Sequence, residues 1–254
     1  MFKHTLPALA AVAVSAAAIP AQAAGEIAFT AFNADEDGWS IVALVDLAPS
    51  SVVFFTDNEW NGSAIGAGGA FNGGESFHRW TIGAAGVAAG TVVRFSSTDT
   101  LSLAASTGTL AREAVSGSAN YGISQSGDTI YAYRGSAADA PTSFLTAITS
   151  AAFNAAEGSL VNTGLAAGVS ALALSSSSDY AEYTGARGGL ASFTGYQPLV
   201  FGIGNWSDLG DGTFATNTPN LTAFSVTPVP EPGSFALLAA GLMAVGFIAR
   251  RRAG

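Results

Sequence analysis

The strongest constraint on the fold of this chain comes from its last 26 residues, which do not have the composition of a globular segment. They begin with VPEPG at residues 229–233, where two prolines disfavour helix. An uncharged run follows at residues 234–249, and three arginines come next, at 250–252. A helix over this run would be roughly 24 Å long, which is short of the ~30 Å hydrocarbon core of a bilayer. The segment therefore predicts a short transmembrane helix, outside the folded body, that spans only with snorkelling arginines or local thinning of the bilayer.

The order of these features also indicates how the chain is sorted. Arginines that end an apolar helix stay cytoplasmic, so everything before the helix is expected outside. The segment resembles the PEP-CTERM sorting signal of bacteria that export exopolysaccharide, through a proline-glutamate-proline motif and a basic membrane stop: Pro230, Glu231, Pro232, Arg250, Arg251 and Arg252. The resemblance implies that an exosortase-type transpeptidase recognises the motif and releases or transfers the body. The alternative is an ordinary C-terminal membrane anchor.

Residues 1–23 have the layout of a secretory signal peptide. Lys3 supplies the positive start, residues 6–19 form the apolar centre, and Ala21 and Ala23 mark a small-x-small cleavage site. Both ends thus predict that the body, residues 24–228, is exported through an inner-membrane intermediate to the cell surface or the extracellular space.

The composition of the body excludes several classes of function. It holds 17 acidic residues, five arginines and no lysine, for a net charge of −12. Such a charge repels nucleic-acid phosphates, so we expect no nucleic-acid partner. The chain has no cysteine, which excludes disulfides, thiol catalysis and cysteine-ligated metals. A body of about 205 residues can be held by its own core.

Short apolar runs and frequent turns predict an all-β fold, an antiparallel sandwich of the immunoglobulin-like kind. The predicted strands are residues 26–32, 39–47, 52–56, 76–82, 91–95, 129–134, 169–174, 199–203 and 221–226. A helical turn is expected only near residues 141–149. At residues 55–60 (FTDNEW) and 179–185 (DYAEYTG) the body is similar to exported bacterial domains with a lamin-tail-like sandwich, a resemblance that implies a fold and transfers no catalytic residue.

The inventory for catalysis is thin, and we assign no catalytic residue. His78 is the only histidine of the body, and no Gly-x-Ser-x-Gly, His-Glu-x-x-His or phosphate-binding motif occurs. A lone histidine next to Arg79 and Trp80 is most often an ordinary strand residue. The sequence therefore favours a protein that is not an enzyme.

Calcium is the one cofactor that the sequence suggests, although our leading expectation is no cofactor. Asn33, Asp35 and Asp37 match the first half of an EF-hand loop, but its twelfth position is Leu44 instead of glutamate. Asp57 and Glu59 form a second acidic pair after a later strand. Two such loops at one end of a sandwich would offer carboxylates to a hard cation. The alternatives are that these turns are simply solvated, or that the carboxylates act as a hydrolytic pair.

Aromatic side chains leave two interpretations open. The four tryptophans and three tyrosines could stack on sugars, or they could fill a sandwich core, which is the commoner case. These residues are Trp39, Trp60, Trp80, Trp206, Tyr180, Tyr183 and Tyr196.

The leading hypothesis is an exported, non-enzymatic component of the cell surface or extracellular matrix. Through the sorting-signal resemblance its setting is exopolysaccharide and biofilm, with an exosortase-type enzyme and matrix polymer as partners. The alternatives are a secreted hydrolase that acts through its acidic loops and a calcium-dependent carbohydrate-binding module.

Overall fold

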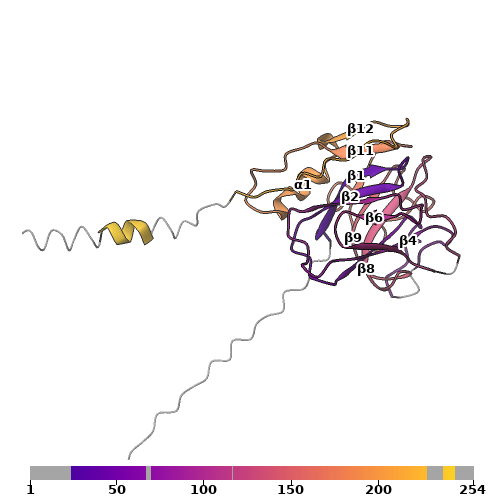
Figure 1. Cartoon of the computed structure of the whole chain (residues 1–254), viewed down its shortest axis with the longest axis horizontal. Coiled ribbons are helices and arrows are strands. Elements are labelled where there is room, and N and C mark those ends of the chain that lie inside the picture. The colour runs from indigo at the N-terminus through magenta and orange to yellow at the C-terminus, as the bar shows by residue number, and fades with distance from the viewer. Residues whose placement is uncertain (1–23, 67–69, 116, 228–236, 244–254) are drawn as a thin grey trace, which may run out of the picture.

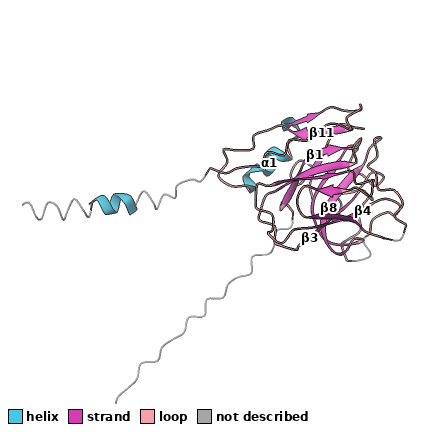
Figure 2. Cartoon of the chain, viewed as in Figure 1, coloured by secondary structure: helices cyan, strands magenta, loops and turns pink. Residues whose placement is uncertain are grey.

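The computed structural model describes residues 24–66, 70–115, 117–227 and 237–243 and shows two six-stranded sheets (Figures 1 and 2). The first sheet has the order β12 (Trp206–Asp208), β11 (Tyr180–Tyr183), β1 (Ile27–Asn33), β2 (Gly38–Ala43), β5 (Val92–Ser96), β6 (Ala104–Ala105). The second has the order β10 (Ala171–Ala173), β9 (Ala140–Thr149), β8 (Thr129–Ala137), β3 (Val52–Thr56), β4 (Phe77–Thr81), β7 (Thr109–Arg112). Helix is confined in the body to η1 (Thr194–Tyr196), α1 (Gln197–Val200) and η2 (Ile203–Asn205).

The predicted all-β sandwich is confirmed, with one departure from antiparallel pairing. Every named strand pair is antiparallel except β9 with β10, which run parallel. The main core lies between the sheets, where side chains of β1, β2 and β5 meet side chains of β3, β4, β8 and β9. Phe55 shows the packing, since its ring contacts Trp39 and Phe95 of the opposite sheet at centroid distances of 5.2 and 4.9 Å. The immunoglobulin-like and lamin-tail-like resemblance stays a prediction.

Three predicted elements are wrong. Residues 141–149 form most of β9 instead of a helical turn, because this strand is buried on both faces and shows no polar alternation. Residues 199–203, predicted as a strand, run from the end of α1, whose first turn holds a proline, through a turn to the start of η2. Residues 221–226 form no strand, and only Val226 makes a bridge, with Leu190.

A second aromatic cluster covers the outer face of the second sheet. Its buried members include Trp60, Phe77, Tyr131, Tyr133 and Phe144. Trp60 comes from the loop after β3, and its indole nitrogen donates a hydrogen bond to the Val161 carbonyl at 3.0 Å. The loop therefore lies over the sheet as a lid, and both faces of β8 and β9 are shielded from water.

The strand order gives the body two chemically different ends. The turn after β1 and the segments after β3, before β4, before β8 and before β11 all lie at one end, which we call the acidic end. It carries Asp35, Glu36, Asp37, Asp57, Glu59, Glu75, Asp128 and Asp179. The opposite end holds residues 184–203 and the last residues of the body, and we call it the strap end.

Two predictions of terminal segments fall mainly outside the described residues. The predicted signal peptide lies wholly outside them. Of the predicted membrane run at 234–249, only residues 237–243 are described, and they are helical. In the part of the chain that the structure describes, no helix has the length and apolarity needed to cross a bilayer.

Candidate functional site

The turn between β1 and β2 ties neighbouring loops to the acidic end. The Asn33 side chain accepts a hydrogen bond from the Glu36 N–H and donates to the carbonyls of Phe214 and Asn217. The two Asp35 carboxylate oxygens accept from the Gln125 side chain and from the Phe214 N–H. Backbone and amide donors thus occupy the ligand atoms that calcium would need.

Asp37 closes the same turn with a left-handed backbone, at φ 56°. Its carboxylate accepts a hydrogen bond from the Ile123 N–H at 2.6 Å. The pKa of Asp37 is raised to about 6, mainly by burial, which the hydrogen bond from Ile123 opposes and the nearby carboxylate of Asp99 supports. Asp37 and Asp99 therefore form a close carboxylate pair, in which a proton or a cation would relieve the repulsion.

A second carboxylate pair, Asp179 with Asp211, lies beside the start of β11. Asp179 is 2% exposed and accepts the Gly212 N–H through one oxygen, while its other oxygen is buried and has no hydrogen-bond partner among the described residues. Burial is the largest cause that raises the pKa of Asp179, and Asp35 and Asp211 add to it.

A separate group of buried carboxylates lies at the ends of β3 and β8. Asp57 is 3% exposed and accepts hydrogen bonds from the N–H and hydroxyl of Ser76 at 2.9 and 2.6 Å. Burial raises the pKa of Asp57 well above its ordinary value, and the charge of Asp128 adds to the effect. Burial likewise raises the pKa of Asp128 to about 7 and that of Glu75 to about 7. These groups favour the protonated form at neutral pH more than ordinary carboxyls do.

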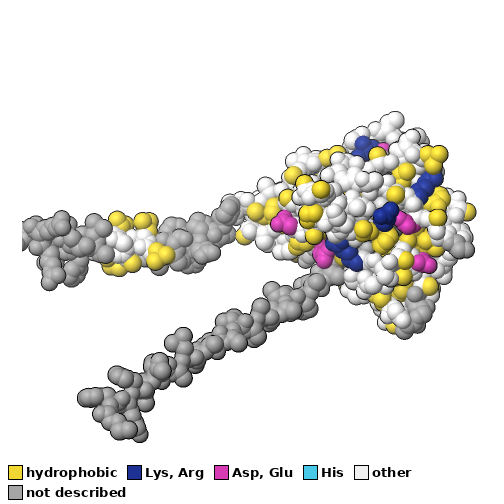
Figure 3. Space-filling model, turned by 60° about the horizontal axis from the view of Figure 1, so that its bottom comes forward, with side chains coloured by type: hydrophobic (Ala, Val, Ile, Leu, Met, Phe, Trp, Pro, Cys, Tyr) yellow, Lys and Arg dark blue, Asp and Glu magenta, His cyan; other side chains and the backbone are white. Residues whose placement is uncertain are grey.

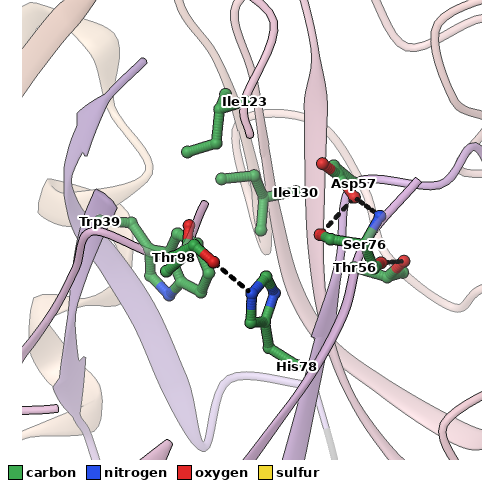
Figure 4. A pocket seen from close by; sticks show the side chains of 8 residues that line it. All are labelled: Trp39, Thr56, Asp57, Ser76, His78, Thr98, Ile123 and Ile130. Atoms are coloured by element: carbon green, nitrogen blue, oxygen red, sulfur yellow. Dashed lines mark hydrogen bonds between the residues drawn. The ribbon is translucent and has the colours of Figure 1, made fainter. Parts of the chain in front are cut away.

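Figure 4 shows the cavity that Asp57 and His78 line between the sheets. The cavity is too small to hold a water molecule. His78 is 1% exposed, and its Nε2 lies 3.3 Å from the Thr98 carbonyl, while Nδ1 has no partner among the described residues. Burial lowers the pKa of His78 to about 4, so the ring is neutral at physiological pH. Neither side chain is open to a substrate in this conformation.

The five predicted calcium ligands do not form one site. Asn33, Asp35 and Asp37 belong to the first sheet, and Asp57 and Glu59 follow β3 of the second. Both loops are at the acidic end, but Thr98 and Ile123 lie between them. Both residues line the cavity beside Asp57, and both also make hydrogen bonds to Asp37. Among the described residues, no group of three or more histidine or acidic side chains is arranged to hold a metal ion.

The predicted aromatic residues belong to the core. All four tryptophans and Tyr180, Tyr183 and Tyr196 are buried. The core interpretation is therefore confirmed, and a sugar-stacking surface built from these residues is wrong. The alternation of residues along the strands could not show that these aromatic side chains are buried, because a loop covers the outer face of the second sheet as well.

The last residues of the body form a strap across the strap end, defined here as residues 220–227. Phe224 is 4% exposed, stacks on Tyr183 at 5.6 Å and meets Tyr196 edge-on at 5.1 Å. The Phe224 N–H donates to the Gly90 carbonyl, and the Thr227 N–H donates to the Leu190 carbonyl at 2.9 Å. The strap is thus fixed to the body up to its last described residue.

Arg187 and Tyr196 complete the attachment of the strap. Arg187 lies over the Phe224 ring at 5.0 Å and donates to the carbonyls of Thr222 and Tyr183. The Tyr196 hydroxyl donates to the Ser225 carbonyl at 2.7 Å. The sequence predicted a strand at residues 221–226, and it gave no indication that Arg187 would hold this segment through Phe224 and Thr222.

Gly90 is required where the strap crosses the body. It has φ 88°, and a Cβ there would lie 2.4 Å from the Phe224 carbonyl oxygen and from Phe193 Cε1. We expect Gly90→Ala to lower the free energy of unfolding by about 2–3 kcal/mol, because backbone strain and the clash add together. Gly164→Ala is the matched control, since Gly164 has φ 77° and nothing within 4 Å of the added Cβ. Urea unfolding measures both, and equal losses would contradict a clash at the strap.

Comparison with known proteins bears on the segment that follows the strap. Residues 228–252 match the family of the PEP-CTERM protein-sorting motif, which confirms the predicted sorting signal. The match implies an exported, cell-surface-directed protein that an exosortase-type enzyme processes. Neither the curated proteins nor the solved structures contain a match to the chain. Apart from residues 237–243, the matched segment lies outside the described residues.

Proposed function

We propose that the folded body is a non-enzymatic component of the cell surface or extracellular matrix, delivered there by exosortase-type processing and associated with exopolysaccharide. The observation that carries the proposal is the sorting motif at residues 228–252, which begins directly after the strap. The surface supports a matrix role, because charged side chains are few on the face drawn in Figure 3 and most of the basic ones lie beside an acidic one. Such a surface offers hydroxyl and amide groups to a hydrated polymer at little desolvation cost.

The buried carboxylates also support a role without catalysis. Asp57 and Asp128, which are both buried, accept hydrogen bonds from backbone N–H groups at the ends of strands. Hydrogen bonds of this kind stabilise turns and leave no acid or base exposed to a substrate. The hydrolase alternative rests on these same carboxylates, and we assign none of them a catalytic role.

Sorting is tested by the mass of the protein recovered outside the cell. In a host with the sorting enzyme we expect a product that lacks residues 1–23 and the arginine tail. Glu231→Ala, or deletion of the sorting enzyme, should leave a membrane-associated precursor with its C-terminus intact. Intact-mass spectrometry of both fractions measures this. Release of the same shortened product from the deletion strain would overturn the proposal.

Association with polymer is tested on the released protein. We expect it to sediment with exopolysaccharide purified from the host and to stay there in 0.5 M salt, because the proposed contacts are mostly uncharged. Recovery entirely in the supernatant would remove the matrix role and leave sorting untouched. Hydrolysis of the polymer during the incubation would favour the hydrolase alternative, with Asp57→Ala as the control variant.

A calcium-dependent binding module is the second candidate, favoured by the carboxylate pair of Asp179 with Asp211. One Asp179 oxygen is buried and has no hydrogen-bond partner in the described part of the chain, and Asp211 is exposed beside it. If calcium bridges this pair, 1 mM calcium should raise the melting temperature over the value in EDTA, and Asp211→Asn should abolish the difference. Asp139→Asn, at an exposed position of the β8–β9 turn, is the control. A melting temperature that is indifferent to calcium would remove this candidate.

A further inference from the structure

The strap end is the part of the body that lies nearest to the sorting motif. Thr227 is hydrogen bonded to Leu190, and Pro230 follows only three residues later. Three residues of chain reach about 11 Å at most. Any enzyme that binds the motif therefore meets Pro230 within about 11 Å of Thr227 and the centre of the motif, Glu231, within about 14 Å, as long as the strap stays in place.

We propose that the sorting enzyme docks on the strap end of the folded body while it binds the motif, with the strap closed. This inference rests on the proposed function, since it names the body surface that the same enzyme contacts. A standard protein interface buries roughly 800 Å² per partner, a patch of roughly 16 Å radius. A patch of that size centred on Glu231 extends beyond the ~14 Å that four residues can reach from Thr227, and it therefore overlaps the body.

The contacts of the strap favour the closed form. Opening it would expose Phe224 and the ring faces of Tyr183 and Tyr196, which are all buried. It would also break the hydrogen bonds that Ser225 and Thr227 make with residues 187–196. A closed strap fixes the point at Thr227 from which the chain runs on to the motif, so an enzyme that binds the motif also lies close to the strap end.

The charge distribution and the chain ends point to the same face. Eight of the 17 acidic residues of the body lie at the acidic end, away from the strap. At the strap end, Glu26 is paired with Arg134 at 2.8 Å, and the exposed Asp46 accepts a hydrogen bond from the Ala89 N–H. Gly25, just after the predicted signal cleavage site, accepts a hydrogen bond from the Gln197 side chain of α1 at the same end. Both membrane-linked ends of the body thus meet beside residues 184–203, and the acidic end faces away.

The loop at residues 190–193 gives the first arm of the test. Ala191 and Ser192 are exposed next to Leu190, so Ala191→Glu with Ser192→Glu adds bulk and charge to the face outside the core. The Ser192 hydroxyl accepts the Gly195 N–H, so Ser192→Ala, which removes this hydrogen bond and adds no charge, is the matched variant for the loop itself. We expect processing of the full-length double-glutamate chain in the host to slow at least about tenfold, because unpaired charges at an interface are strongly unfavourable. Leu101→Glu with Ala119→Glu is the matched control at the acidic end, and it should be processed at the wild-type rate. Processing of the Ala191 and Ser192 double variant at the wild-type rate would overturn the docking proposal.

A disulfide that locks the strap gives the second arm. A Cβ built on Gly188 lies 3.0 Å from the Ser225 hydroxyl oxygen, so Gly188→Cys with Ser225→Cys is placed to form a disulfide. The chain has no other cysteine that could compete. We expect the oxidised variant to be processed like the wild type. If it accumulates uncut while each single-cysteine variant is cut, the strap must open and closed docking is wrong.

Pulse-chase labelling with intact-mass detection measures the rate of processing in both experiments. Glu231→Ala distinguishes a failure of the proposed sorting from a failure of the docking proposal. If Glu231→Ala is cut like the wild type, the proposed sorting fails and the docking inference falls with it. If Glu231→Ala blocks cutting and the strap-end variants have no effect, only the docking inference is overturned. Equal thermal unfolding of the secreted double-glutamate variants shows that their folding is intact.

Discussion

We expect the body to become more stable as the pH falls from about 7 to about 4, the opposite of ordinary acid denaturation. Burial raises the pKa of Asp128 to about 7 and that of Glu75 to about 7, and it raises the pKa of Asp57 well above its ordinary value. The folded state therefore binds more protons than the unfolded state in this range. A group whose pKa is raised by folding contributes stability that is present below its unfolded pKa and is lost as the pH rises through its folded value.

His78 acts in the opposite direction over the same range. Burial lowers its pKa to about 4 from an ordinary value of 6.5, so it destabilises the fold as the pH falls through this window. One pKa unit corresponds to about 1.4 kcal/mol, so Asp128 alone gives about 4 kcal/mol and His78 takes back about 3. Asp57 and Glu75 act in the same direction as Asp128, and Glu75 contributes less because it is only half-buried, so we expect a net gain in the free energy of unfolding on the order of 1–2 kcal/mol between pH 7.5 and 4.5, or roughly 2–6 °C in melting temperature.

Asp57→Asn identifies the buried carboxylates as the cause. Asparagine keeps an oxygen that can accept the hydrogen bonds from Ser76 but carries no charge, so the variant should gain stability at pH 8 and change little at pH 4.5. Asp139→Asn, at an exposed turn, should change neither value. Calorimetry from pH 4 to 8 measures all three proteins. A wild-type melting temperature that falls steadily from pH 7.5 to 4.5 would show that the carboxylates are ionised in the fold.

Strands that are short, continuous apolar runs or that alternate cleanly could be predicted from the sequence, and a strand with neither pattern could not. The run at residues 52–56 coincides with β3, and residues 129–134 open β8. β9 is hidden from this logic because Leu145 and Ile148 face the main core while Phe144 and Ala147 face the second aromatic cluster. A strand covered on both sides by a sheet and by a loop lid has no polar face to reveal it.

The candidate sites show a similar limit. The acidic turns could be read from the sequence, and their location at one end of the sandwich follows from strand pairing. Whether Asp35 faces a cation or the Phe214 N–H depends on a loop about 180 residues away, which no local pattern contains. The sorting motif is different, because it acts as a short linear signal and its recognition needs only residue order. The strap combines both kinds of information. Arg187, Tyr183 and Tyr196 hold it on the body, and the linear motif follows directly after it.

Trp60→Ala is expected to destabilise the body by about 3–5 kcal/mol, roughly 10 °C in melting temperature, because it opens the second aromatic cluster. The Trp60 side chain is 0% exposed and lies edge-on to Phe71 and Phe144 at 5.2 and 5.1 Å. Its removal leaves a cavity under the loop that covers β8 and β9 and leaves the Val161 carbonyl without its indole donor. Urea unfolding at pH 7 measures the loss.

Two companion variants separate packing from the hydrogen bond and from sugar recognition. Trp60→Phe keeps a ring against Phe144 and loses only part of the volume and the donor, so about 1–2 kcal/mol is expected. Leu101→Ala, at a side chain that is 91% exposed, should stay within about 0.5 kcal/mol of the wild type. Because Trp60 is covered, folded Trp60→Phe protein should bind exopolysaccharide as tightly as the wild type. A variant that unfolds normally and loses polymer binding would instead place Trp60 on a sugar-stacking surface, and the lid would have to open for it to act.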